Sequence, residues 1–239
     1  MADISSYIDY LECSYRAHHS NRMPELTIAH AKSLVIADTA KYFLSRVGEG
    51  KEVSSLDLRN RLSLAWCKVK EESGLTYDWR DLLSVAKQLT RVYTLRGGKD
   101  SVIAVNFPVE IDLLPGVKVT GDIDAILLKN NKDLEVISFD YTTFARRTTK
   151  SPQLRLLAGF FDIGIRDSKI TRLARKYTFY RTGTGGLRRL NISRYSDNDT
   201  KSILGDIHKS IDDGAYLPTT NTDICKDCLH NTVCLWSQT

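Results

Sequence analysis

The spacing of apolar residues changes near residue 100, and this change limits the chain to folds that combine helices with a sheet. Before residue 100, apolar residues recur at helical spacing in the stretches 28–43, 55–72 and 76–96. After it, three stretches are rich in Val, Ile and Leu and are bounded by turn residues, which is typical of strands: 101–111, 117–129 and 134–142. We therefore expect an α/β protein.

The chain then returns to a helix, two further strands and a last helix. Ser151 and Pro152 predict a helix that begins there, because serine caps helices and proline fits the first helical position. Two strands are expected within 174–195, and a helix over 199–212. No repeat or linker divides the sequence, so we expect one domain. Its expected parts are a helical region (1–100), a core (101–195) and a cysteine-rich tail (196–239).

The composition is that of a soluble globular protein. Of 239 residues, 42% are hydrophobic and 26% are charged, which excludes a disordered chain, a collagen-like repeat and a membrane bundle. The N-terminus lacks the basic start and apolar stretch of a secretory signal, so we expect a cytoplasmic protein with no membrane partner. The net charge of +5 leans towards an anionic partner.

Three of the five cysteines crowd the last fifteen residues, as Cys225-x-x-Cys228 followed by Cys234. In a reducing compartment, clustered cysteines indicate metal ligation rather than disulfides. Cys13 is the expected fourth ligand. Four thiolates suit either Zn²⁺ or an iron–sulfur cluster, and the spacing does not separate the two. Cys67, on a predicted helix, is expected to be a small buried apolar residue.

Two aspartates lie on neighbouring predicted strands. Strand alternation places Ile123, Ala125 and Leu127 on one face of the strand and Asp124 on the other. A hairpin between the two strands would bring Asp124 and Asp140 together. Two adjacent carboxylates repel unless a cation joins them, and Mg²⁺ or Mn²⁺ is the usual choice. The alternative is that both are solvated strand ends.

Several short motifs occur in a fixed order along the chain: Cys13, Ala29-His30, Gly121-Asp122-Ile123-Asp124, Ile137-Ser138-Phe139-Asp140-Tyr141-Thr142-Thr143, Gln153 and the cysteine tail. In this order they resemble the PD-(D/E)XK (restriction-endonuclease-like) nuclease core, in particular its RecB-type branch, which includes the Cas4 nucleases and the AddB nuclease domain. That branch reads approximately G-x-x-D, D-Y-K-T and Q-x-x-x-Y, between an early cysteine and a final C-x-x-C-x5-C. The resemblance covers nearly the whole chain and implies a small mixed sheet flanked by helices.

The resemblance also implies roles for individual residues. Asp124 and Asp140 would ligate Mg²⁺ or Mn²⁺, with His30 as a third ligand and the Tyr141 carbonyl as another. Gln153 would help to orient the attacking water or a phosphate oxygen. Taken without the resemblance, His30 is an ordinary half-buried histidine and Gln153 a polar residue in a first helical turn. For the four cysteines, the resemblance implies a [4Fe–4S] cluster that joins the two ends of the chain.

The sequence departs from the family pattern at two positions. The family's lysine is Thr142 here, and its second aromatic is Leu157. A neutral threonine hydroxyl cannot replace a cation that stabilises the water nucleophile and the charge on the phosphate. Either a cation comes from elsewhere, with Arg146, Arg147 and Lys150 as the nearest candidates, or the protein binds DNA without cutting it.

Basic residues concentrate between residues 146 and 189. The expected contacts to nucleic acid are Arg146, Arg147, Lys150, Arg188 and Arg189. Aromatic residues lie between them and could stack on bases: Tyr177, Phe179 and Tyr180. The alternative is a solvated basic face with aromatic side chains in the core.

Together these features predict a DNA-processing protein that binds DNA ends or single strands. The two departures favour a degenerate active site in a subunit of a larger DNA-processing assembly with protein partners. One alternative is an active Mg²⁺- or Mn²⁺-dependent deoxyribonuclease with a relocated cation. A second is a zinc-stabilised protein-interaction module.

Overall fold

The computed structural model describes most of the chain outside its loops and tail. The described residues are 2–14, 28–74, 83, 87, 101–129, 133–140, 149–168, 170, 174–183, 186–217, 219, 225 and 234. For residues 28–30, 73, 140, 174, 180–183 and 186–188 the description covers the backbone alone.

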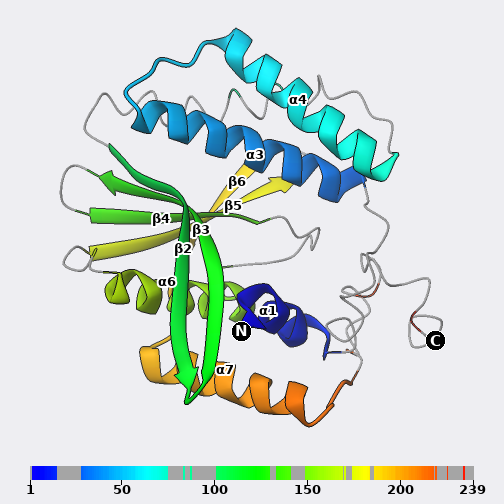
Figure 1. The fold of residues 1–239 in the computed structure, drawn as a ribbon, viewed down its shortest axis with the longest axis vertical. Helices are drawn as coiled ribbons and strands as arrows, with labels where there is room; N and C mark the ends of the chain where they lie inside the picture. The colour runs from blue at the N-terminus through cyan, green and yellow to red at the C-terminus, as the bar shows by residue number, and fades with distance from the viewer. Residues whose placement is uncertain are drawn as a thin grey trace.

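A mixed sheet of six described strands forms the centre of the protein (Figure 1). The strands are β1 (Ala2–Asp3), β2 (Ser101–Leu114), β3 (Val117–Lys129), β4 (Asp133–Asp140), β5 (Ala174–Gly183) and β6 (Gly186–Ile192). Their order is β1-β3-β4-β5-β6, with β2 also paired to β3. The pairs β2–β3, β3–β4 and β5–β6 are antiparallel, whereas β1–β3 and β4–β5 are parallel. The predicted strands and the α/β fold class are confirmed.

Helices cover both faces of this sheet (Figure 1). On one face lie α3 (Ile28–Gly48) and α4 (Ser55–Ser73), and on the other lie α1 (Ile4–Glu12), α6 (Pro152–Asp167) and α7 (Asp197–Asp212). Each face has its own apolar cluster, as expected when amphipathic helices bury their stripes against a sheet. The helices expected near 28–43, 55–72, 151 and 199–212 are confirmed. No helix in the described part of the chain is long and apolar enough to cross a membrane.

Side-chain caps account for several helix boundaries. Ser54 and Asp57 form a reciprocal capping box at the start of α4, which ends at Gly74 with a φ of 69°. At α6, Ser151 is the N-cap and Pro152 the first residue, as predicted. The Ser151 hydroxyl, however, donates to Oε1 of Gln153 at 2.6 Å and makes no side-chain cap bond to the backbone.

The side chains of β3 change faces at Asp124. The prediction that Ile123, Ala125 and Leu127 share one face of the strand is therefore wrong. Ile123 packs in the cluster beneath α6, whereas Ala125 and Leu127 pack in the cluster beneath α3. The register pairs Val105 with Ala125 and Phe107 with Ile123, so that Asn106 of β2 lies opposite Asp124. Asn106 has a φ of 52°, outside the β region, and this irregularity lets both strands change faces at one place.

Two predicted features fall mainly outside the described residues. The helix expected over 76–96 is represented by Leu83 and Lys87, both helical. Residues 130–132, between the strands 117–129 and 134–142, are not among the described residues, although these strands pair as the expected antiparallel hairpin.

Candidate functional site

Asp124 lies where β3 and β4 separate. The backbone pairing of the two strands ends at Ala125 and Ile137. Beyond that point the Asp124 side chain takes the place of the backbone hydrogen bonds between the strands. Its Oδ2 accepts hydrogen bonds from the Phe139 N–H at 2.7 Å and from the Ser138 hydroxyl at 3.2 Å. Asp124 is only 4% exposed. It is therefore a buried, oriented carboxylate, and the alternative of a solvated strand end is wrong for this residue.

A lysine from the neighbouring helix layer reaches the same carboxylate. Lys41 of α3 places its Nζ 2.5 Å from Oδ1 of Asp124, and its side chain is 24% exposed. A buried carboxylate requires a compensating charge or hydrogen bonds, and Asp124 has both. A cation beside Asp124 therefore comes from α3, and it is not one of the candidates predicted from the sequence, which are Arg146, Arg147 and Lys150. The sequence did contain a signal for Lys41. It follows His30 by eleven residues, close to three helical turns, so the two residues lie on the same face of the helix.

The other predicted ligands are placed by their backbones. Asp140 is the last residue of β4, directly after Phe139, and pairs with Arg181 of β5. His30 is the third residue of α3. The side chains of Asp140 and His30 lie outside the described set, so the proposed ligand set stays a prediction. Among the side chains that are described, no three His, Cys, Asp or Glu residues form a group that could hold a metal ion.

The remaining members of the predicted site are only partly covered by the structure. Gln153 lies in the first turn of α6, half-buried, and is bonded to Ser151. Lys150 lies exposed in the preceding turn. Outside the described residues lie Tyr141, Thr142, Arg146, Arg147 and Cys228.

A second buried carboxylate lies near the start of β4. Glu135 is fully buried, and it binds the Thr178 hydroxyl at 2.7 Å, the Lys129 ammonium and the Arg189 guanidinium. Burial alone would raise the pKa of Glu135, but hydrogen bonds from Lys129 and Thr178 and the charges of Lys129 and Arg189 hold it below its ordinary value. Arg189, a predicted nucleic-acid contact, is thus already paired with a carboxylate. Its neighbour Arg188 is described by its backbone alone.

The aromatic residues of β5 are core residues where their side chains are described. Tyr177 is 4% exposed and Phe179 is 1% exposed. The Tyr177 hydroxyl donates to Asp162 of α6, and burial together with this carboxylate raises the pKa of Tyr177. Base stacking by these two rings is therefore excluded, and the alternative of core aromatics is correct for them.

Cys13 and two tail cysteines are near enough for their charges to interact, although the three do not form a group that could hold a metal ion. Cys13 ends α1, and Cys225 and Cys234 belong to the tail; all three are half-buried. Burial raises the pKa of the Cys225 thiol, and the nearby Cys13 and Cys234 raise it further. Cys67 is exposed, contrary to expectation. The reason is that Cys67 does not belong to the apolar face that α4 packs against α3, which consists of Leu58, Leu62, Trp66 and Val69.

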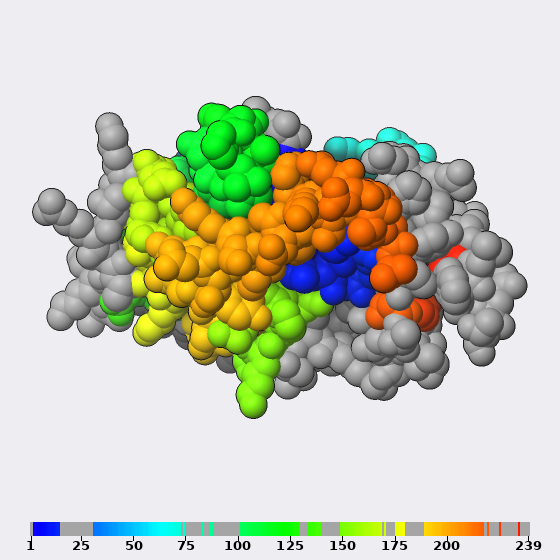
Figure 2. Space-filling view, turned by 90° about the horizontal axis from the view of Figure 1, so that it is seen from below, coloured from blue at the N-terminus to red at the C-terminus, as the bar shows by residue number. Residues whose placement is uncertain are grey.

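Hydrogen bonds independent of the cysteines hold these two ends together. The Tyr10 hydroxyl donates to the Ala215 carbonyl at 2.5 Å. The Ser14 hydroxyl bonds both the carbonyl and the N–H of Leu217, at 2.5 and 2.6 Å. Tyr7 Oη lies 3.2 Å from Nδ1 of His208 in α7. Figure 2 shows α1 (blue) lying directly against α7 (orange). Cys13, which follows α1, therefore lies near the segment that follows α7.

Comparison with known proteins identifies the class of fold. No protein-family model and no curated protein sequence matches the chain. The crystal structure of a proposed exonuclease from Eubacterium rectale matches with a TM-score of 0.50 and 11% identity, over 100% of this chain and 87% of that chain. The protein therefore shares the α/β fold of that structure; at this identity the match shows the fold alone. The crystal structure of SSO0001 matches over 99% of this chain and 98% of that chain at 16% identity, but its TM-score of 0.42 supports no argument.

Proposed function

We propose that the protein is a DNA-processing enzyme that binds DNA ends or single strands and hydrolyses them at a divalent-metal site. The proposed ligands are Asp124, Asp140 and His30, with Gln153 beside them. The observation that carries this proposal is the buried Asp124 carboxylate at the point where β3 and β4 separate. The nuclease-like fold is consistent with it, and the matched Eubacterium rectale protein is itself a proposed exonuclease.

The chemistry of Asp124 fits a divalent metal ion. Carboxylate oxygens are preferred ligands of Mg²⁺ and Mn²⁺. The Phe139 N–H and the Ser138 hydroxyl fix the orientation of the carboxylate through Oδ2, as outer hydrogen bonds do for metal ligands. Oδ1 faces a cation already, the Lys41 ammonium. When bound, such an ion lowers the pKa of a coordinated water and polarises a phosphoryl oxygen.

We also propose that Cys13, Cys225, Cys228 and Cys234 hold a [4Fe–4S] cluster, with Zn²⁺ as the alternative. The pKa of the Cys225 thiol, raised by burial and by the charges of Cys13 and Cys234, supports this, because it puts these three cysteines within electrostatic reach of one another. The role of the cluster would be structural. It would close a loop over nearly the whole chain and so restrict the unfolded state.

A second candidate is a DNA-binding subunit that does not cut. Two sequence features favour it: Thr142 stands where the resembled family has a lysine, and Leu157 stands where it has an aromatic. Such a subunit would act in a larger assembly whose partner does the cutting.

Cleavage of end-labelled single-stranded DNA with Mn²⁺ separates the two candidates. The anaerobically purified protein should cut, and Asp124→Asn and Asp140→Asn should each lose most of this activity. Asp122→Asn is the matched control, because Asp122 lies exposed two residues before Asp124 on the same strand. Binding of DNA without cutting by the folded wild-type protein would reject the proposed hydrolysis and support the second candidate.

A further inference from the structure

Asn106 of β2 lies directly opposite Asp124 of β3. Two pairs flank it in the same register: Val105 with Ala125 and Phe107 with Ile123. The register is therefore continuous across this point, and neither strand gains a residue. Asn106 nevertheless has a φ of 52°, in the left-handed region, whereas strand residues have a negative φ. A backbone irregularity in β2 thus faces the candidate metal ligand.

This irregularity turns both strands over at one place. In a regular strand, residues two apart point to the same face. Phe107, however, packs in the cluster beneath α6, while Val105 packs in the cluster beneath α3. Ile123 and Ala125 of β3 divide between the same two clusters. A left-handed residue within a strand redirects the side chains beside it, so Asn106 accounts for the change in β2, and the pairing carries the change to β3.

The change of face directs the Asp124 side chain towards β4. Side chains of a regular strand stand roughly perpendicular to the sheet, so they do not reach the backbone of the next strand. Asp124 does reach it, because its Oδ2 accepts the Phe139 N–H at 2.7 Å. The orientation of this carboxylate therefore depends on the local backbone of β3, which is paired with Asn106 and its neighbours.

We propose that Asn106 is a positioning residue for the candidate metal site. Its left-handed backbone directs the Asp124 carboxylate towards the end of β4, where Asp140 lies. The inference rests on the proposed function and adds to it a residue outside the proposed ligands. Asparagine suits the position, because it adopts the left-handed conformation more readily than other residues with a side chain. A β-branched residue would be strained at this φ and would favour a regular strand.

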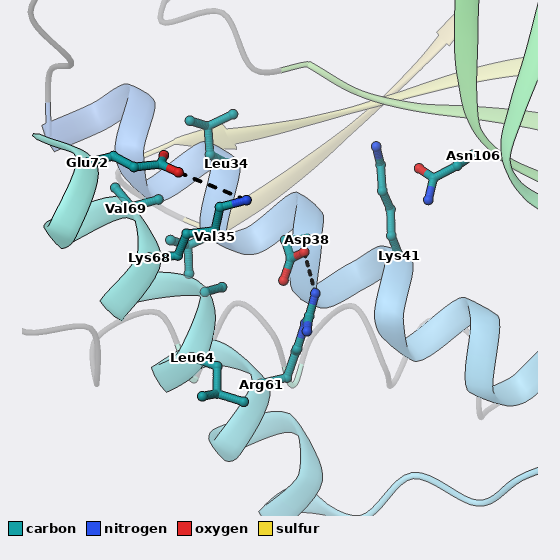
Figure 3. Close-up of a pocket in the computed structure, with 11 residues that line it drawn as sticks. Leu34, Val35, Asp38, Lys41, Arg61, Leu64, Lys68, Val69, Glu72 and Asn106 are labelled. Atoms are coloured by element: carbon teal, nitrogen blue, oxygen red, sulfur yellow. Dashed lines mark hydrogen bonds and ion pairs between the residues drawn. The ribbon is translucent and has the colours of Figure 1, made fainter.

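The side chain of Asn106 has little packing of its own. It is exposed and lines a cavity of about 460 Å³ between α3, α4 and β2. In Figure 3 it lies beside Lys41, on the side of the cavity that the strands form. A substitution at residue 106 therefore changes the preferred backbone conformation more than it changes the packing of the core.

Three variants separate the backbone of residue 106 from its side chain. Asn106→Val disfavours the left-handed conformation, and Asn106→Gly permits it without the asparagine side chain. Val109→Ala is the matched control, because Val109 is buried in the same strand and its truncation destabilises the protein without altering residue 106. Thermal unfolding checks that each variant is folded and compares their losses of stability.

The first measurement is hydrogen exchange of the Phe139 amide in the metal-free protein, followed by nuclear magnetic resonance. The rate is expressed relative to amides of the β5–β6 pair, which corrects for a change in global stability. Asn106→Val should speed this relative exchange about tenfold, the factor that corresponds to losing one hydrogen bond to a carboxylate. Asn106→Gly and Val109→Ala should leave it unchanged.

The second measurement is the Mn²⁺ dissociation constant, from electron paramagnetic resonance. Asn106→Val should raise this constant by about 10- to 100-fold, the usual effect of disturbing the groups that orient a metal ligand. Asn106→Gly should bind Mn²⁺ as the wild type does, and so should Val109→Ala. Recovery by glycine identifies the backbone conformation as the cause, because glycine supplies no side chain.

The results that would overturn the inference are distinct from those that would reject the proposed function. If the wild type binds Mn²⁺ and a folded Asn106→Val matches it in either measurement, Asn106 does not position the metal site and the proposed function stands. Equal losses in Asn106→Gly and Asn106→Val would assign the effect to the asparagine side chain and overturn the inference. If Asn106→Val does not fold, Asn106→Ala takes its place under the same criteria. Failure of the wild type to bind Mn²⁺ would reject the proposed metal site, and with it any role of Asn106 in metal binding.

Discussion

Two buried carboxylates lie in neighbouring strands, and each is compensated by cations and hydrogen bonds. Glu135 is enclosed by Lys129, Arg189 and Thr178, so its charge is compensated on several sides. Asp124 accepts a hydrogen bond from strand β4 and contacts Lys41 of α3. Glu135 is therefore bonded to groups of the sheet, whereas Asp124 joins the sheet to helix α3.

The first prediction concerns the pH dependence of stability at Glu135. The pKa of Glu135 is lowered in the folded protein, so its charged form stabilises the fold above the unfolded pKa of about 4.3. This contribution is lost as the pH falls through the lower folded pKa. Glu135→Gln should cost about 3 kcal/mol at pH 7, because breaking a buried ion pair leaves charges uncompensated. The cost should shrink in acid.

Urea denaturation from pH 7 down to pH 3 measures this difference. Glu71→Gln is the control, because Glu71 lies exposed on α4. A cost for Glu135→Gln that stays constant across this range would show that its charge does not stabilise the fold.

At the scale of elements, helices and strands followed from periodicity, and the exceptions have local causes. The helices α3, α4, α6 and α7 and the strands β2 to β6 lie close to their predicted ranges. The reversal in β3 escaped prediction because it depends on Asn106 in the partner strand; the available signal was Pro108, two residues further along that strand, since a proline within a strand often marks a bulge. β1 has two residues, too few for any period to show.

Gly121, the glycine of the G-x-x-D motif, has a packing role. A Cβ at this position would lie 2.5 Å from Cγ2 of Ile4 and 3.0 Å from Cε1 of Phe160. Helices α1 and α6 therefore approach β3 as closely as they do because residue 121 has no side chain. We infer that this glycine is required by the fold rather than by the chemistry at Asp124.

The second prediction tests this role with a double-mutant cycle. Gly121→Ala should destabilise the protein by about 1–3 kcal/mol, the usual cost of overpacking. Ile4→Leu removes the Cγ2 methyl, so the cost of Gly121→Ala should be smaller in that background. Thermal unfolding measures both. Gly205→Ala is the control, since a Cβ there meets nothing within 4 Å. Equal costs in the two backgrounds would contradict the proposed clash.

At the scale of the whole molecule, residues 10–14 meet the segment that follows α7. The prediction that Cys13 joins the tail cysteines as a fourth ligand stays a prediction, although the charges of Cys13 and Cys234 act on the Cys225 thiol. The hydrogen bonds of Tyr10 and Ser14 to the segment after α7 could not be predicted, because they join residues about 200 positions apart through backbone carbonyls. Lys41 was missed for a similar reason: its partner Asp124 is distant in sequence.

The third prediction concerns the metal content of this junction. Anaerobically purified protein should contain about four irons per chain if a [4Fe–4S] cluster is present. Cys13→Ser should lose most of this iron, whereas Cys67→Ser, at an exposed position on α4, should keep it. Far-ultraviolet circular dichroism of Cys13→Ser should stay helical, because Tyr10 and Ser14 still bind the tail segment. Zinc without iron in the wild type would contradict the cluster and support the zinc alternative.

The most direct test of the account is whether Asp124 binds a divalent metal ion. Mn²⁺ titration followed by electron paramagnetic resonance should show binding to the wild type and to Asp122→Asn, and a large loss of affinity in Asp124→Asn. Thermal unfolding must show that Asp124→Asn remains folded. If folded Asp124→Asn binds Mn²⁺ as tightly as the wild type, Asp124 is not a metal ligand and the proposed active site is wrong.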